Sequence, residues 1–172
     1  MSLALATAVV AGPAGYPAKS PKNPVAPMAP PPTGCNCFGP GATFDVFGGG
    51  ILPNGGGKNA LGGGVGVDYF FNRYLGVDLN YGVYATNSEH HEFDGNLVLR
   101  LPIDSLCIAP YAIAGGGYSV NSVKRGNWDV GGGLDIRIPS SNCLGIFAEG
   151  AYHFAEKGDD YATVRLGLRV PF

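Results

Sequence analysis

The chain has 172 residues, of which 45% are hydrophobic and only 14% are charged, and its formal net charge at pH 7 is −2. This charge gives no basic footprint, which argues against nucleic-acid binding. No apolar run reaches the roughly 18–20 residues that a membrane helix requires, and few charged residues are present to solvate an ordinary surface. A membrane protein of this composition would therefore span the bilayer as a closed β-barrel.

The first 40 residues differ in composition from the rest of the chain. Residues 1–15 contain an apolar stretch, 3–11, followed by small residues, although no basic residue precedes it. This pattern is typical of the later part of a secretory signal, so we interpret residues 1–15 as a signal-peptide remnant, with a disordered apolar tail as the alternative. Residues 16–40 are so rich in Pro that neither helix nor sheet can form, which predicts an extended linker.

Beyond residue 41 the chain alternates apolar with small or polar residues in eight segments, separated by short, turn-rich breaks. Alternation with a period of two is typical of β-strands with one apolar wall. Strands joined by short breaks must be antiparallel neighbours, and an even number of them returns the C-terminus to the side of entry. The predicted strands are 42–53, 59–71, 75–84, 93–103, 107–120, 128–138, 144–154 and 161–172; for 107–120 the facing of the side chains stays unassigned.

The last predicted strand, 161–172, shows the alternation most clearly. Arg165 and Arg169 share one of its walls, and the other wall is apolar. The segment has about the length of 9–11 residues that a tilted strand needs to cross a bilayer, and it ends on an aromatic residue. We therefore expect Leu168→Arg to impair insertion more than Arg169→Leu impairs folding. The apolar wall is interpreted as the assembly signal, and it consists of Val164, Leu166, Leu168, Val170 and Phe172.

Two barrel types share this alternation and differ in which wall faces inward. The apolar wall lines the core of a soluble barrel, whereas it faces lipid in a membrane barrel. The polar wall here consists largely of Gly, Ala and Asn, and Gly on a solvated wall would weaken a strand without return. Inside a narrow barrel, Gly leaves room for large side chains, so we predict a membrane barrel. Aromatic residues near strand ends fit interfacial girdles; they are Tyr69, Phe71, Trp128, Tyr152, Phe154 and Phe172.

Three runs and the terminal Phe172 together resemble the small eight-stranded outer-membrane barrels of the OmpA/OmpX type. The runs are G-V-D-Y-F-F-N-R-Y-L-G-V-D-L-N-Y-G from residue 66, L-R-L-P-I from residue 99 and A-E-G-A-Y-H-F from residue 148. The resemblance covers residues 41–172. It implies a network of carboxylates and basic groups inside the barrel, to which Asp78, Arg100, Glu149 and Arg165 correspond by position.

The alternation itself also places charged residues on the inner wall. A buried, unpaired charge would cost several kcal/mol, so these groups should pair with one another. A rigid, packed core is favoured over a pore lining because eight strands leave an interior that side chains can fill. The inner-wall residues are Asp45, Asp68, Asp78, Asp129, Asp135, Glu149, Arg100, Arg137, Arg165 and Arg169.

An enzyme would need a nucleophile beside a base. His153 follows Glu149 by four residues on the inner wall, but neither Ser119 nor Ser122 is placed convincingly beside it. We therefore expect no catalytic residues. The run from Glu89 through His91 could hold a metal ion loosely, but a solvated loop is the preferred interpretation, and neither a metal ion nor a cofactor is expected.

The four cysteines should gather at one end of the barrel. If the first strand begins at the periplasmic end, Cys107 and Cys143 each open an outward strand there, and Cys35 and Cys37 precede the first strand on that side. An even number of cysteines at one rim of an exported protein indicates disulfides. We expect Cys35 and Cys37 each to bridge to one of Cys107 and Cys143, with both pairings open. A four-thiolate metal site is the alternative, although the spacing lacks paired knuckles.

These observations predict an all-β protein, an eight-stranded antiparallel up-and-down transmembrane barrel over residues 41–172 with a Pro-rich periplasmic segment before it. We expect a monomer in the outer membrane of a Gram-negative-type cell, with both termini periplasmic. Its partners would be outer-membrane lipids and, during biogenesis, the barrel-assembly machinery. The expected role is structural or surface-supporting; a small pore, an adhesin-like surface-binding protein and a lipid-modifying enzyme are the alternatives.

Overall fold

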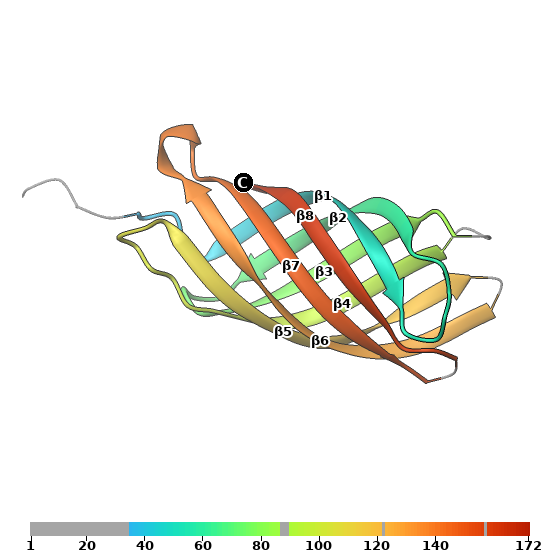
Figure 1. Cartoon of the computed structure of the whole chain (residues 1–172). Coiled ribbons are helices and arrows are strands. Elements are labelled where there is room, and N and C mark those ends of the chain that lie inside the picture. The colour runs from blue at the N-terminus through green and yellow to red at the C-terminus, as the bar shows by residue number, and fades with distance from the viewer. Residues whose placement is uncertain (1–34, 87–89, 122, 157) are drawn as a thin grey trace, which may run out of the picture. The chain divides into compact units, whose positions relative to one another are not determined.

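The computed structural model describes residues 35–86, 90–121, 123–156 and 158–172. These residues belong to one compact unit. The predicted signal-peptide remnant and most of the predicted linker lie outside the described residues. The strands are β1 (Gly41–Pro53), β2 (Ala60–Phe70), β3 (Leu75–Tyr84), β4 (His90–Arg100), β5 (Ile108–Asn121), β6 (Val123–Ile138), β7 (Leu144–Ala155) and β8 (Tyr161–Pro171), with a short 3-10 turn, η1 (Pro139–Ser141), before β7 (Figure 1).

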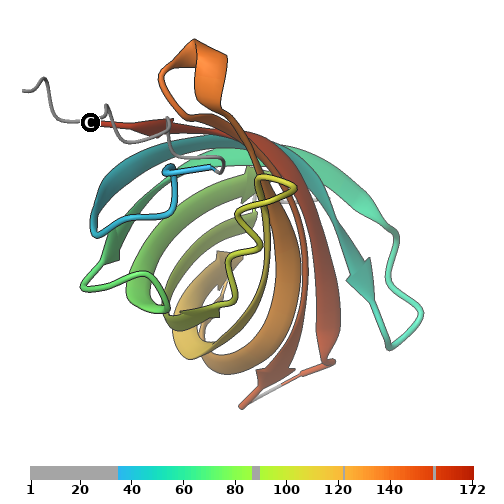
Figure 2. The ribbon, with the colours of Figure 1, turned by 90° about the vertical axis from the view of Figure 1, so that its left-hand side faces the viewer.

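The eight strands form a closed barrel in which each strand pairs with its neighbour in the sequence. Every pairing is antiparallel, and β1 closes the sheet against β8, with Phe44 opposite Val170 and Val46 opposite Leu168. Figure 2 shows the strands wrapping around a common interior. The predicted eight-stranded up-and-down barrel is therefore confirmed. Closure leaves no strand edge unpaired, because the first and last strands satisfy one another.

Three strand boundaries differ from the prediction by three residues or more. β4 begins at His90, three residues before the predicted start at Phe93, because His90 pairs with Tyr84 in the ladder. It ends at Arg100 instead of Ile103, and Pro102 in the following turn has no N–H to continue the ladder. β6 begins at residue 123 instead of 128, since the β5–β6 hairpin stays paired almost to its tip. The added residues, 90–92 of β4 and 123–127 of β6, are mostly polar, and for that reason the sequence predicted loops there.

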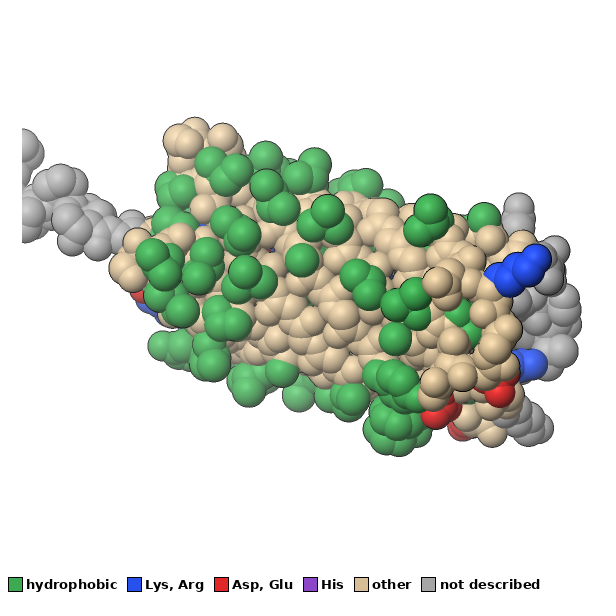
Figure 3. Space-filling view, viewed as in Figure 1, with side chains coloured by type: hydrophobic (Ala, Val, Ile, Leu, Met, Phe, Trp, Pro, Cys, Tyr) green, Lys and Arg blue, Asp and Glu red, His purple; other side chains and the backbone are tan. Residues whose placement is uncertain are grey.

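The apolar walls face outward all around the barrel. Figure 3 shows hydrophobic side chains spread over the visible face. On β8 the outward wall has Leu166 at 63% and Leu168 at 49% exposure, whereas Arg165 and Arg169 on the same strand are each 3% exposed. β5, which the alternation left unassigned, turns Tyr111 inward. Among the described residues, no helix has the length and apolar character needed to cross a membrane.

Glycines make room for the large side chains inside. A Cβ built on Gly64 would lie 2.6 Å from Cζ of Phe47, and one on Gly133 would lie 2.6 Å from the ring of Tyr111. These contacts are closer than side-chain packing permits, so the rings occupy the volume that the glycines leave free. The aromatic rings reach across the barrel interior for this reason.

Candidate functional site

The barrel interior holds a dense set of charged side chains. The structure buries all ten inner-wall residues named from the sequence, and it adds Glu92 and Asp94 of β4 to them. Both lie at even-numbered positions of β4, on the same wall as Asn96 and Arg100. Asp94 falls inside the predicted strand, and its alternation would have found it, whereas Glu92 lies before the predicted start. The interior thus contains eight carboxylates and four arginines among the described residues.

Arg169 of β8 joins three strands in the half of the barrel that carries the C-terminus. Its guanidinium nitrogens lie 2.7 Å from Asp45 on β1, 2.8 Å from Asp68 on β2 and 3.1 Å from Asp135 on β6. Arg137 donates two hydrogen bonds of 2.8 Å to the same Asp135. This fork-to-carboxylate geometry gives strong, charge-assisted hydrogen bonds.

Arg100 is buried by different means from those expected. Among the described residues it has no carboxylate within ion-pair distance; its guanidinium lies 3.5 Å from the ring centroid of Phe70. It donates hydrogen bonds to the main-chain oxygens of Arg73 at 3.2 Å and Gly39 at 3.3 Å. Cation–π stacking and carbonyl acceptors therefore replace the predicted ion pair.

The other half of the barrel depends on a single arginine. Arg165 lies 2.9 Å from Asp94, 3.5 Å from Glu149 and 3.7 Å from Glu92. Within the described part of the chain, the carboxylate of Asp129 has no hydrogen-bond partner, and neither does Oδ1 of Asp78. This half, in contrast to the first, has more carboxylates than cations.

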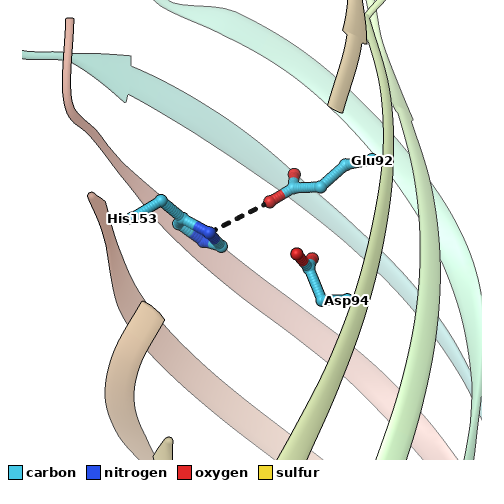
Figure 4. A group of neighbouring side chains, drawn as sticks. All are labelled: Glu92, Asp94 and His153. Carbon is cyan, nitrogen blue, oxygen red and sulfur yellow. Dashed lines mark ion pairs between the residues drawn. The ribbon is translucent and has the colours of Figure 1, made fainter. Parts of the chain in front are cut away.

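His153 belongs to this second half, and Figure 4 shows it facing Glu92 and Asp94. Its Nε2 is 3.0 Å from Oγ1 of Thr163, and its Nδ1 is 3.3 Å from Oε1 of Glu92. A hydroxyl, an imidazole and a carboxylate are in the order of a hydrolase triad. The hydroxyl comes from Thr163, whereas the sequence indicated only Ser119 and Ser122 as candidate nucleophiles. His153 and Thr163 are each 1% exposed, so both side chains are buried in the interior.

The histidines assigned to a loop lie in the sheet instead. His90 and His91 pair with Tyr84 and Val83 in the β3–β4 ladder, which corrects the prediction of a solvated loop. Nδ1 of His91 is 2.9 Å from the hydroxyl oxygen of Tyr81. Glu89 and Ser122 lie outside the described residues.

The four cysteines meet at the end of the barrel that carries the C-terminus, here called the terminal rim (the start of β1, the end of β8 and the turns 71–74, 101–107 and 139–143). Cys37 is bridged to Cys143 over a separation of 106 residues. Cys35 and Cys107 are free thiols; Cys35 is buried, and Cys107 packs against the cluster that Cys35 forms with Phe38 and Ala109. Hydrogen bonding to Cys35, with burial second, raises the pKa of the Cys107 thiol to about 11.

The segment between the cysteines and β1 covers the interior at this rim. Phe38 is 2% exposed, and the guanidinium groups of Arg100 and Arg137 lie 5.2 and 5.9 Å from its ring centroid. The backbone N–H of Cys35 donates a 3.0 Å hydrogen bond to the carbonyl of Asp104. The segment thus packs on top of the charged interior as part of its core.

No protein-family model and no curated protein matches the chain. Solved structures do share its fold. The N-terminal β-barrel domain of OprF from Pseudomonas aeruginosa is 17% identical, with a TM-score of 0.52 over 79% of this chain and 98% of that one. Neisserial surface protein A is 13% identical, with a TM-score of 0.57 over 76% of this chain and 96% of that one.

A transmembrane β-barrel designed de novo is also similar, at 21% identity and a TM-score of 0.55 over 77% of this chain and 97% of that one. These identities show a shared fold alone. Since a designed barrel and natural surface proteins have the same architecture, function has to be argued from the interior and the rim.

Proposed function

We propose that the protein is an integral outer-membrane barrel with a structural role, whose interior is closed to solutes. The support for membrane insertion is the outward wall, where large apolar side chains are exposed on every strand from β1 to β8 while the charged residues point inward. Water would make such a wall aggregate, whereas lipid covers it. Outer-membrane lipids are then its lasting partners, and the barrel-assembly machinery its partner during insertion.

The observation that carries the closed interior is the contact of Arg169 with three carboxylates. Its partners lie on β1, β2 and β6, so these contacts extend across the barrel. The ring of Phe147 lies against the same guanidinium, 4.7 Å away, and fills space beside it. Water-filled conduction would require this network to separate, at a cost of several kcal/mol for each stranded charge.

Planar-bilayer recording of the purified protein tests this proposal. We expect a flat baseline from the parent protein and also from Phe38→Ala, because the ion pairs below Phe38 keep the interior closed. Arg169→Ala is the matched variant that removes the network itself, and we expect it to show openings if it inserts. Discrete openings in the parent protein would replace the structural role with that of a small pore.

The segment before β1 is proposed to be held at the terminal rim by two bridges, with that rim on the periplasmic side. Cys37–Cys143 is the first, and the contact between Cys35 and Cys107 favours a second. In the chain-entropy model the first bridge stabilises by about 4.7 kcal/mol. With it closed, the second would close a ring of about 38 residues and add roughly 4 kcal/mol.

Peptide mapping without reductant tests the second bridge. We expect one peptide that joins Cys35 to Cys107 and one that joins Cys37 to Cys143. Reduction should expose the segment to protease while residues 41–172 stay protected, because the hydrogen-bonded ladder is already closed. Free thiols at Cys35 and Cys107 in protein from an oxidising compartment would contradict the second bridge.

We propose no catalytic role for the barrel, and we propose that it acts as a monomer. The triad-like group around His153 faces the filled interior, and both His153 and Thr163 are 1% exposed. Incubation with lipid A or phospholipid followed by mass spectrometry of the lipid checks this point. A product that disappears in Thr163→Val would overturn it.

A further inference from the structure

The second half of the interior contains an unusual convergence of metal-binding atoms. Glu92 and Asp94 from β4 and His153 from β7 each offer a ligand atom, and these atoms lie within 4.8 Å of one another. The side chains point toward a common space in Figure 4. Glu92 is fully buried, and Asp94 and His153 are 4% and 1% exposed.

Several oxygens around this space have no hydrogen-bond partner among the residues that the structure describes. They include Oε2 of Glu92, Oδ1 of Asp94 and Oδ1 of Asn127. Asn127 is itself only 8% exposed. Asp94, Gly117 and Asn127 stand in one row across β4, β5 and β6. A Cβ built on Gly117 would collide with Oδ1 of Asp94 and come within 3.0 Å of Oδ1 of Asn127. Both unpartnered oxygens therefore project into the volume that Gly117 leaves free.

The charge around this space is also unbalanced. Glu92, Asp94 and Glu149 share the single guanidinium of Arg165. Asp129, directly opposite His153 in the β6–β7 ladder, adds a carboxylate with no partner. In the half that carries the C-terminus, three carboxylates (Asp45, Asp68, Asp135) are buried together with three arginines (Arg100, Arg137, Arg169), of which Arg137 and Arg169 pair with them directly. An additional cation in the second half would restore the balance that the first half already has.

We propose that this cluster binds one divalent first-row transition-metal ion, with Glu92, Asp94 and His153 as its ligands. An imidazole together with carboxylates suits zinc or manganese better than magnesium or calcium, which take oxygen ligands alone. Nε2 of His153 lies 3.0 Å from Oγ1 of Thr163 and would donate its proton there, which would fix the ring. The lone pair of Nδ1, which lies 3.3 Å from Nδ2 of Asn127, would then bind the metal in place of that contact. Asn127 Oδ1 faces the same space and supplies a further oxygen.

The metal would enter during folding. Ile51, Ala60, Tyr84 and Tyr161 form a buried apolar cluster where β1 and β3 end and β2 and β8 begin, at the barrel end remote from the terminal rim. The ring of Tyr161 stacks on His153 with centroids 4.6 Å apart. These rings cover the cluster, so an ion held beneath them should exchange slowly once the barrel has closed.

The test is to unfold the full chain in urea with a chelator, remove the chelator, and refold the protein into detergent micelles with zinc chloride alone. After gel filtration, elemental analysis should find about one zinc per chain. Glu92→Gln and His153→Gln keep the side-chain shapes and should lower zinc affinity by at least roughly tenfold. His91→Gln is the control: it removes an imidazole from the opposite wall of β4, and this variant should retain zinc as the parent does.

The thermal melting temperature gives a second readout. It should rise with zinc in the parent and in His91→Gln, and stay unchanged in Glu92→Gln, which decides the matter even if His153→Gln does not fold. Manganese chloride in place of zinc identifies the preferred ion. A zinc content below about a tenth of an equivalent per chain in the parent would overturn the proposal. It would mean that protons alone neutralise the carboxylates. Equal retention in the parent and both ligand variants would also overturn the proposal, since the zinc would then be on the surface.

Discussion

Replacing Arg169 with Leu would leave three buried carboxylates without their shared cation. Asp45, Asp68 and Asp135 all lie within 3.1 Å of the guanidinium, and the Arg169 side chain is only 4% exposed. Removing one member of a buried ion pair costs about 3–5 kcal/mol, because the remaining charge stays buried. Leu168→Arg places a charge on the lipid-facing wall next to it, at a cost of roughly 2–4 kcal/mol near the midplane. The structure therefore predicts that Arg169→Leu destabilises the barrel at least as much as Leu168→Arg, in contrast to the ranking expected from the sequence.

Reversible urea unfolding in lipid vesicles measures both effects. Trp128 is the only tryptophan of the chain, and it lies on the outward wall stacked on Phe154, so its fluorescence reports insertion directly. A second substitution, Asp45→Asn, removes one of the stranded charges. It should cost less in the Arg169→Leu background than in the parent, because the two residues are coupled.

Two results would refute this reasoning. Unfolding midpoints equal to that of the parent for both Arg169→Leu and Leu168→Arg would show that the inward and outward walls are assigned wrongly. Additive effects of Arg169→Leu and Asp45→Asn would show that the 2.7 Å ion pair between them contributes nothing.

Gly133→Ala should destabilise the barrel by about 1–3 kcal/mol in the same urea assay, because the added Cβ meets the carbonyl oxygen of Ala148 and the Tyr111 ring; Gly150→Ala, with its nearest neighbour at 3.9 Å, is the control and should be neutral. Deleting Phe172 removes one main-chain hydrogen bond to Ala42, so we expect about 1 kcal/mol or less in stability but a clear loss of barrel inserted in cells; normal insertion would contradict its role as an assembly signal. In reduced protein, the raised pKa of about 11 keeps Cys107 protonated at pH 8, so alkylation should be on the order of 100-fold slower than for an ordinary thiol and should accelerate as the pH rises toward 11. Fast alkylation of Cys107 at pH 8 would show that Cys35 does not lie beside it.

The alternation of side chains was sufficient to predict the barrel and most of its two walls. Leu166 and Arg165 fall on opposite walls in any strand of this sequence, whatever its partners. The start of β4 could not be predicted in the same way, because His90, His91 and Glu92 are as hydrophilic as a loop. Their strand conformation comes from pairing with the end of β3, which a single sequence does not reveal.

The strand register sets the position of each interior side chain along the barrel axis. This position decides which interior charges come into contact. Asp45 opposite Arg169 and Glu149 opposite Arg165 are neighbours across one ladder, so the order of strands nearly suffices to pair them. Asp94 reaches Arg165 across the interior from β4 to β8, over a separation of 71 residues, and alternation carries no information about such a contact. For the same reason the sequence did not reveal that one half of the interior is balanced in charge while the other depends on Arg165. The uneven distribution of charge arises because the strand register brings Glu92, Asp94 and Asp129 into the same half of the barrel. An additional cation would therefore have its largest effect on stability in that second half.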